Sequence, residues 1–333
     1  MPVHMRVQTE KSAIQVGCRR MRQAGAWQPN GCVWTKTIIA VLIGALAAPG
    51  WAVSASAKNA RVTGLTHIAY YVTDLYRSRE YYEGFLGFQE AFVLKGHDGQ
   101  VRAAYVKIND REFIELLVET PQTKENHGYL HDVGFKTSDA ESLRAHLASM
   151  GLKVPAEATR DAAGNLRFEV RDPSGFTLAV VQYLPNSMTG RSLGKSLPAA
   201  RISTQIDHIG LLESNKEAAW AFYANAFGLE KEGNGSKMTI PGSFARFEIG
   251  FERKPATIAR YHVKDHICLS VPNVPAVVAM LNAKPMAKNY RTIETHVLGN
   301  GKHVAELYDP DGNRIELMEP PQQKAAAVNR ENQ

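Results

Sequence analysis

The chain has 333 residues, 44% of them hydrophobic and 22% charged, and a formal net charge of +6. This length predicts two domains on the usual scale of about 150 residues each. The basic excess lies in the first 57 residues, and the rest of the chain has only one more basic than acidic residue. The charge therefore gives no reason to expect a nucleic-acid partner.

Residues 1–57 are predicted to be a leader that contains a secretory signal peptide. An apolar run at 37–48 follows Lys36, and the small residues 55–57 follow the run. A basic residue, a short apolar run and a small-residue cleavage site are the layout of such a signal. We expect cleavage near 57/58 and a periplasmic or secreted protein with no membrane partner after cleavage. The run is shorter than the about 20 residues of a bilayer span, so an uncleaved anchor is the lesser alternative.

The stretch 1–32 is longer than an ordinary basic region of a signal peptide. It suggests an over-extended start, with natural initiation near Val33. Cys18 and Cys32 fall in the leader, which leaves Cys268 alone in the mature chain. No internal disulfide is then possible, and an exported protein without one must be stabilised by its core.

The segment 58–185 is predicted to be a first α+β domain. Alternating apolar residues indicate strands, apolar residues at helical spacing indicate helices, and Pro, Gly and Asp indicate turns. The predicted elements in chain order are the strand 66–72, the helix 77–87, strands within 103–118, the strand 130–135, the helix 140–151 and the turn and strand 172–178.

A Gly-, Ser- and Pro-rich segment at 186–200 is predicted to be a linker. A second domain, 201–320, and a polar tail, 321–333, follow it. The predicted elements of this domain are the strand 206–209, the helix 216–228, the strand 244–251, the strand 265–269, the helix 274–283 and the turn and strand 309–317.

The two domains repeat one pattern. His67 corresponds to His208, His131 to His266 and Asp172 to Asp309, at offsets of 141, 135 and 137 residues. Such fixed offsets indicate one domain duplicated with small insertions. Within each domain the order strand, helix, three strands occurs twice, which predicts paired βαβββ units.

The second domain carries the residues of a metal site. Glu316 lies in an apolar strand, where a carboxylate is costly unless it is paired or bound to a cation. His208 and His266 each lie in another apolar strand. Two histidines and one carboxylate from separate strands are the donors of a catalytic metal site with open positions.

These motifs, above all Asp-Pro-Asp-Gly-Asn-Arg-Ile-Glu-Leu at 309–317, resemble the vicinal oxygen chelate superfamily, which includes glyoxalases, bleomycin resistance proteins and extradiol dioxygenases. The resemblance covers residues 62–320. It implies two tandem α+β domains, each a half-open mixed sheet barrel with helices outside. It also implies a divalent metal held by His208, His266 and Glu316, with Glu248 as a fourth ligand.

The resemblance implies a degenerate site in the first domain. His67, Glu115 and His131 match three ligand positions, but Ala179 stands where the second domain has Glu316. Two-domain extradiol dioxygenases resemble this arrangement, with an idle first domain. Whether these three residues hold a second metal is left open by the sequence.

Three functions remain open. The two-domain layout favours an Fe(II) ring-cleaving dioxygenase, although Glu306 stands where such enzymes usually have a tyrosine. The Asp-Pro-Asp-Gly turn favours a glyoxalase- or epimerase-type lyase or isomerase with Mn, Ni or Zn, and a non-catalytic binder that sequesters a small molecule is the third reading. Each would take a small-molecule ligand, and a homodimer is compatible with the sequence. Candidate acid and base groups are His262, His303 and Tyr308.

Overall fold

The computed structural model describes residues 61–120, 130–251 and 265–320. The predicted leader with its apolar run, the predicted tail 321–333 and the candidate His262 lie outside these residues. Within the described part of the chain, no helix is long and apolar enough to cross a membrane.

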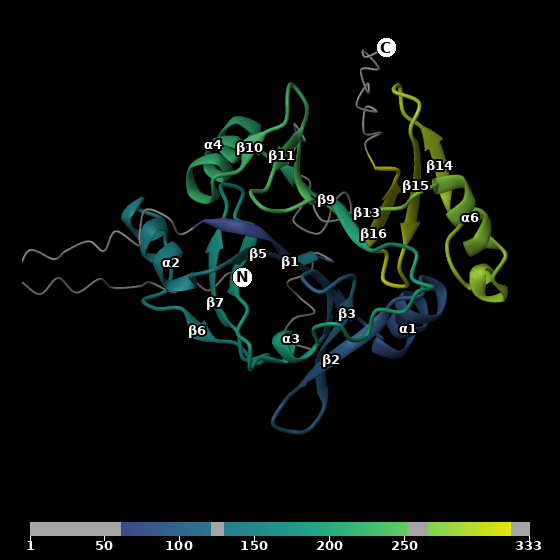
Figure 1. Cartoon of the computed structure of the whole chain (residues 1–333), viewed down its shortest axis with the longest axis horizontal. Helices are drawn as coiled ribbons and strands as arrows, with labels where there is room; N and C mark the ends of the chain where they lie inside the picture. The colour runs from purple at the N-terminus through teal and green to yellow at the C-terminus, as the bar shows by residue number, and fades with distance from the viewer. Residues whose placement is uncertain (1–60, 121–129, 252–264, 321–333) are drawn as a thin grey trace, which may run out of the picture. The chain divides into compact units, whose positions relative to one another are not determined.

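Two mixed sheets of eight strands form the two domains (Figure 1). The first sheet has the order β2-β3-β4-β1-β5-β8-β7-β6 and the second the order β10-β11-β12-β9-β13-β16-β15-β14. The strands of the first sheet are β1 (Val62–Val72), β2 (Gln89–Lys95), β3 (Val101–Lys107), β4 (Phe113–Val118), β5 (Leu130–Thr137), β6 (Thr159–Arg160), β7 (Leu166–Arg171) and β8 (Thr177–Gln182). Those of the second are β9 (Gln205–Glu213), β10 (Glu230–Lys231), β11 (Lys237–Thr239), β12 (Arg246–Phe251), β13 (His266–Ser270), β14 (Glu294–Val297), β15 (His303–Tyr308) and β16 (Arg314–Met318).

Each sheet consists of two βαβββ units joined at its centre. In the first, β1 pairs parallel with β4, β5 pairs parallel with β8, and β1 pairs antiparallel with β5. In the second, β9, β12, β13 and β16 pair in the same way. The predicted duplicated α+β fold is confirmed, and the first sheet curls into a half-barrel.

Three of the four predicted helices begin at the predicted residue and the first begins two residues earlier, at Leu75, and each of the four has an Asp or Asn cap. Such a side chain accepts from a backbone N–H of the first turn that would otherwise lack a partner. The four helices capped by Asp or Asn, with their caps, are α1 (Leu75–Arg79, Asp74), α2 (Ala140–Ser149, Asp139), α4 (Lys216–Phe227, Asn215) and α6 (Val274–Asn282, Asn273). The first continues as the π-helical turn η2 (Glu80–Phe85), and the 3₁₀ turn η3 (Pro285–Asn289) follows α6.

The predicted linker packs against the first domain. It contains the short helix α3 (Met188–Arg191), and Thr189 within it is buried. The ammonium group of the fully buried Lys107 donates to the backbone carbonyls of Ser192 and Lys195. A buried ammonium needs such acceptors, so this bond ties the linker to β3.

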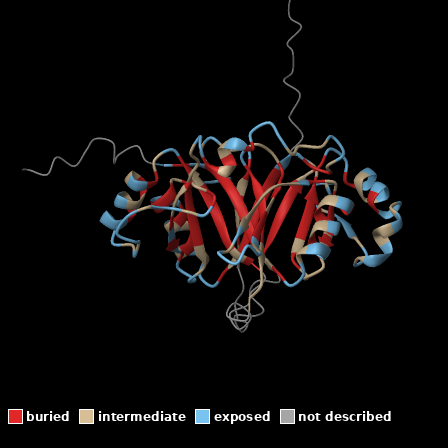
Figure 2. Ribbon diagram, turned by 90° about the horizontal axis from the view of Figure 1, so that it is seen from below, coloured by how far each residue is buried: buried red, intermediate tan, exposed pale blue. Residues whose placement is uncertain are grey.

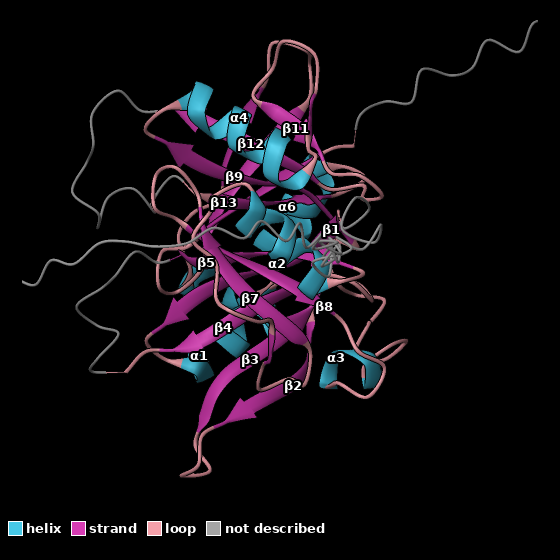
Figure 3. Cartoon of the chain, turned by 90° about the vertical axis from the view of Figure 1, so that its left-hand side faces the viewer, coloured by secondary structure: helices cyan, strands magenta, loops and turns pink. Residues whose placement is uncertain are grey.

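Figure 3 shows α4 beside β12 of its own sheet, and aromatic rings of α4 and η2 reach the other domain. Phe227 of α4 stacks on Phe135 of β5 with ring centroids 4.9 Å apart. Tyr81 of η2 meets Tyr290, directly after η3, at the same distance of 4.9 Å. Figure 2 shows buried residues along the strands, with the exposed ones largely on helices and loops. The two domains therefore share one core.

Candidate metal centre

Three neighbouring strands of the second sheet bring the predicted ligands together. His208 lies on β9, His266 on β13 and Glu316 on β16, and all three side chains are buried. Cys268 of β13 is the register partner of both His208 and Glu316. The ligand atoms of His208, His266 and Glu316 lie within 4.8 Å of one another.

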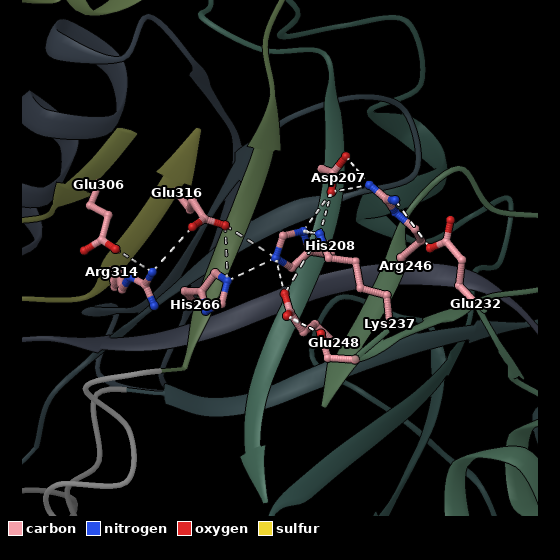
Figure 4. Close-up of polar contacts among 11 residues, drawn as sticks. Asp207, His208, Glu232, Lys237, Arg246, Glu248, His266, Glu306, Arg314 and Glu316 are labelled. Carbon is pink, nitrogen blue, oxygen red and sulfur yellow. Dashed lines mark hydrogen bonds and ion pairs between the residues drawn. The ribbon is translucent and has the colours of Figure 1, made fainter. Parts of the chain in front are cut away.

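The distances within this group are short (Figure 4). The two Nε2 atoms of His208 and His266 are 3.1 Å apart. Glu316 Oε2 lies 3.5 Å from each of them. Glu248, on β12, places Oε2 2.8 Å from His208 Nε2, while its Oε1 accepts a hydrogen bond of 2.6 Å from Ser236. Glu248 thus reaches the group from the edge, through His208.

His208 is oriented from behind by a second set of charges. Asp207 Oδ1 lies 2.7 Å and Lys237 Nζ 3.0 Å from His208 Nδ1. Arg246 binds both oxygens of Asp207 at 2.5 Å. When Nδ1 carries the proton and donates it to Asp207, Nε2 presents its lone pair to the ligand group, which is the usual support of a metal-binding histidine.

Burial and ion pairing act against each other on these groups. Burial lowers the pKa of His208, but the hydrogen bonds to Asp207 and Glu248 outweigh burial and raise it. Burial raises the pKa of both glutamates, but His208 holds that of Glu248 well below its usual range and His266 brings that of Glu316 to about 2. Both carboxylates are therefore ionised at neutral pH.

The donor set fits a divalent metal. Two imidazole nitrogens and carboxylate oxygens suit a borderline ion such as Fe(II), Mn(II), Ni(II) or Zn(II). Ligand atoms about 2.1 Å from one ion stand roughly 3.0–3.4 Å apart at neighbouring positions. The observed separations of 3.1 and 3.5 Å agree with this spacing. Lone pairs of two nitrogens and two carboxylates crowded together also need positive charge between them.

Arg314 holds the outer side of Glu316. Its guanidinium lies 3.4 Å from Glu316 Oε1 and 2.7 Å from Glu306 Oε1. The candidate Tyr308 donates to Glu306 Oε2 at 3.1 Å, and Arg291 stacks 3.9 Å from the centre of its ring. Tyr308 is thus linked to the group through Glu306 and Arg314 rather than by direct contact.

The candidate His303 is not joined to this group. Its side chain is 46% exposed, and its Nδ1 lies 3.8 Å from Glu319. In the part of the chain that the structure describes, no hydrogen bond or ion pair links it to His208, His266 or Glu316.

The sequence reasoning missed Asp207, Lys237, Arg246 and Arg314, because only the Asp-His pair at 207–208 offers a sequence signal for any of them.

In the first domain, the residue that corresponds to His266 is one position away from the predicted His131. Asp132 is the register partner of Ala69, as His266 is of Gly210, so Asp132 and not His131 occupies the position of His266. The pairing of His131 with His266 was therefore wrong, because sequence similarity aligned the histidines rather than the strand register. His131 instead packs edge-on against Tyr71, with ring centroids 5.1 Å apart.

A network of ion pairs surrounds Asp132. Its Oδ1 lies 2.8 Å from His67 Nε2, and its Oδ2 lies 2.5 Å from Arg167 and 3.0 Å from His131 Nδ1. Burial raises the pKa of Asp132, but the contacts with His67, His131 and Arg167 hold it well below its usual range. Glu115 is 3.5 Å from His67 Nε2, and Ala179 is fully buried opposite Gly134. The matching position of Arg167 in the second domain is Val304.

Comparison with known proteins agrees with this fold. The model of the Glyoxalase/Bleomycin resistance protein/Dioxygenase superfamily matches residues 64–180 and 205–317. The match covers more than half of the chain and falls once on each domain. The chain therefore belongs to this superfamily, as the sequence motifs predict. A comparison with curated protein sequences gave no match.

Solved structures share the fold at low identity. The 2,3-dioxygenase LapB from Pseudomonas sp. KL28 is 17% identical, with a TM-score of 0.55 over 78% of this chain and 93% of that one. The Mn(II)-bound glyoxalase from Novosphingobium aromaticivorans is 16% identical, with a TM-score of 0.54 over 78% and 83%. Homoprotocatechuate 2,3-dioxygenase from Brevibacterium fuscum, in complex with 3,4-dihydroxyphenylacetate, is 16% identical, with a TM-score of 0.55 over 81% and 84%.

Proposed function

We propose that the protein is a metal-dependent enzyme that acts on a small substrate with two adjacent oxygen atoms, of the extradiol ring-cleaving dioxygenase type. The observation that carries this proposal is the convergence of His208, His266 and Glu316. Two histidines and one carboxylate leave positions open for substrate and O₂ on a non-haem Fe(II) ion. The likeness to LapB and to the Brevibacterium enzyme supports the layout.

The residues divide the work between holding the ion and handling protons. An ion held by His208, His266 and Glu316 would polarise the two oxygens of the substrate. Asp207 keeps the His208 ring in place, and Arg314 holds Glu316 so that Oε2 faces the histidines. Glu248 is ionised and, at 26% exposure, is the most accessible of the four side chains. It is therefore the base positioned to take a proton from an arriving substrate.

The test is the metal content of the full chain, purified without oxygen and measured by plasma mass spectrometry. We expect about one equivalent in the wild type, its loss in Glu316→Ala and its retention in the control Glu230→Ala, an exposed acid on β10. Oxygen uptake on addition of catechol should accompany Fe(II). Metal that survives in Glu316→Ala would contradict the site. A wild type that takes up no Fe, Mn, Ni or Zn would leave a small-molecule binding protein as the better reading.

A second candidate, a lyase or isomerase, is favoured by Glu248. Its Oε2 lies 2.8 Å from His208 Nε2, close enough to be a fourth ligand that fills one of the positions O₂ would need. Glu248→Gln separates the two. In a dioxygenase the metal should remain and oxygen uptake should fall about 10²–10⁴-fold, the range of general-base catalysis. In a lyase or isomerase the metal should be weakened, and Mn, Ni or Zn should support proton exchange beside a carbonyl without O₂.

We also propose that the protein is exported. The signal-like leader supports this, and it predicts an intact mass for the mature protein that begins near Lys58. Mass spectrometry of the periplasmic or secreted fraction tests it. A cell-associated product that keeps residues 37–48 would indicate an uncleaved anchor instead.

A further inference from the structure

A cleft whose lining includes none of the candidate metal ligands lies where the two domains meet. It has a volume of about 360 Å³, which is within the range of small-molecule sites. It is lined by the starts of β1 and β9, the β3–β4 turn, the end of β5, Leu197 of the predicted linker and the loop before β12. The lining combines charged and apolar side chains, among them Asp110, Arg111, Glu112, Lys136, Ile206 and Phe244.

The acids of this cleft already have partners. Asp110 accepts from Lys107 Nζ at 2.7 Å and from the backbone N–H of Gly194 at 2.8 Å. Glu112 is buried and accepts from Asn109 Nδ2 at 2.7 Å and from the backbone N–H of Ile206 at 3.4 Å. These bonds fix the β3–β4 turn to the linker and to β9, so the walls are preorganised before any ligand arrives.

The cations of the cleft are held less tightly. Among the described residues, neither the Arg111 guanidinium nor the Lys136 ammonium makes a direct ion pair; Lys136 lies 5.5 Å from the centre of the Tyr183 ring, and the charge of Glu112 acts on both cations from a longer distance. Burial lowers the pKa of Lys136 and the nearby charge of Arg111 lowers it further, whereas Glu112 raises it. Two like charges at one cleft repel each other, and a bound anion would relieve that repulsion.

The rest of the lining is apolar enough to hold more than an inorganic ion. Leu65 and Ile206 are buried in the wall, and Phe244 is 51% exposed although it lines the cleft. An exposed aromatic ring beside a cation pair suits a ligand with an acidic end and an apolar body. We propose that this cleft binds a small organic acid, its carboxylate between Arg111 and Lys136 and its apolar body against Phe244.

Benzoate is the probe. Benzamide is its neutral counterpart, and inorganic phosphate is an anion that lacks an apolar group. Titration calorimetry of the full chain at low salt should show one saturable benzoate site. We expect at least a tenfold loss of affinity in Arg111→Gln/Lys136→Gln and in Phe244→Ser. The matched control Arg77→Gln/Lys153→Gln, which removes two exposed cations elsewhere, should bind as the wild type does.

The metal centre could also attract a carboxylate, so the titration is repeated in Glu316→Ala. Binding that persists there and disappears in the Arg111/Lys136 variant supports the cleft whether or not the proposed enzymatic function is right. Equal affinity for benzamide, unchanged affinity in the Arg111/Lys136 variant, or binding lost in Glu316→Ala would each overturn the proposal. Phosphate binding without benzoate binding would overturn the proposal that the ligand is an organic acid. Circular dichroism checks that each variant is folded.

Discussion

Gly210 shows how a single residue makes room for a neighbouring side chain. A Cβ at this position would lie 2.3 Å from His266 Cε1 and 2.8 Å from its Nδ1. The matching residue of the first domain is Ala69, which is tolerated because Asp132 there is smaller than a histidine. The glycine is thus a requirement of His266, and it gives the second domain room for a histidine at this position.

Gly210→Ala should therefore disturb the metal centre more than the fold. The added methyl group forces the His266 ring to move, since the backbone of a central strand has little freedom to shift. We expect at least a tenfold loss of metal affinity with a loss of stability of about 1–3 kcal/mol, the range of overpacking substitutions. Metal titration and chemical denaturation measure the two effects. Unchanged affinity would show that His266 is not a ligand, and Gly250→Ala on β12 is the control.

At the scale of the element, β5 and β13 have the same register on their partner strands, and the two domains differ in the residue type at one position of that register. Neighbouring residues of a strand point to opposite faces. Asp132 therefore occupies the position of His266, while His131 lies beside Tyr71. A buried carboxylate needs positive charge, and Arg167 of β7, on the far side of β8, provides it at 2.5 Å. In the second domain the matching Val304 carries no charge.

Removal of Arg167 should reveal this dependence. Arg167→Met leaves the buried Asp132 with only its histidine partners, and breaking a buried pair typically costs about 3–5 kcal/mol. Urea denaturation should show a loss of this order, while Arg171→Met, exposed on the same strand, should stay within about 0.5 kcal/mol of the wild type. The double variant Arg167→Met/Asp132→Asn should recover much of the loss. Equal effects of both arginine variants would contradict the role of the ion pair.

Over the whole molecule, two tyrosines join the domains in a reciprocal manner. Tyr82 of the first domain donates to Asp309 of the second, and Tyr223 of the second donates to Asp172 of the first, each at 3.0 Å. Both acceptors are the first residues of the Asp-Pro-x-Gly turns. These turns therefore serve the contact between the domains as well as the start of the strand that follows.

One of these contacts includes a second carboxyl group, and this predicts a pH dependence. Burial, together with the neighbouring Asp172, raises the pKa of Glu213 to about 9. The folded state then keeps a proton that the unfolded state releases near its ordinary pKa. Its stabilising effect is complete below that ordinary pKa and is lost as the pH rises toward 9.

Glu213→Gln should flatten this dependence. For one proton the slope is at most about 1.4 kcal/mol per pH unit. The pKa values of His131 and His208 are also raised, so these two groups contribute to the pH dependence near neutral pH. We therefore compare the free energy of unfolding of the wild type minus that of the variant between pH 7.5 and 9. Unfolding free energies that run parallel over this range would contradict a protonated Glu213.

Much of the fold could be predicted from the sequence because its signals are local. The caps Asp74, Asp139, Asn215 and Asn273 define where helices begin, and apolar alternation defines the strands. The repeat offsets predicted the duplication, and the position of His208, His266 and Glu316 in three separate strands predicted that they could meet. Their role as metal ligands stays a prediction until metal is measured.

The tertiary structure decided what depends on strand pairing and on contacts between distant segments. Strand pairing placed Asp132 rather than His131 opposite Ala69. The sequence similarity aligned His131 with His266 and carries no information on which residues pair across strands. Asp207, Lys237 and Arg246 meet at His208 only because β9, β11 and β12 lie side by side. Local sequence determined the elements and the types of donor, whereas long-range pairing determined which charges face each other.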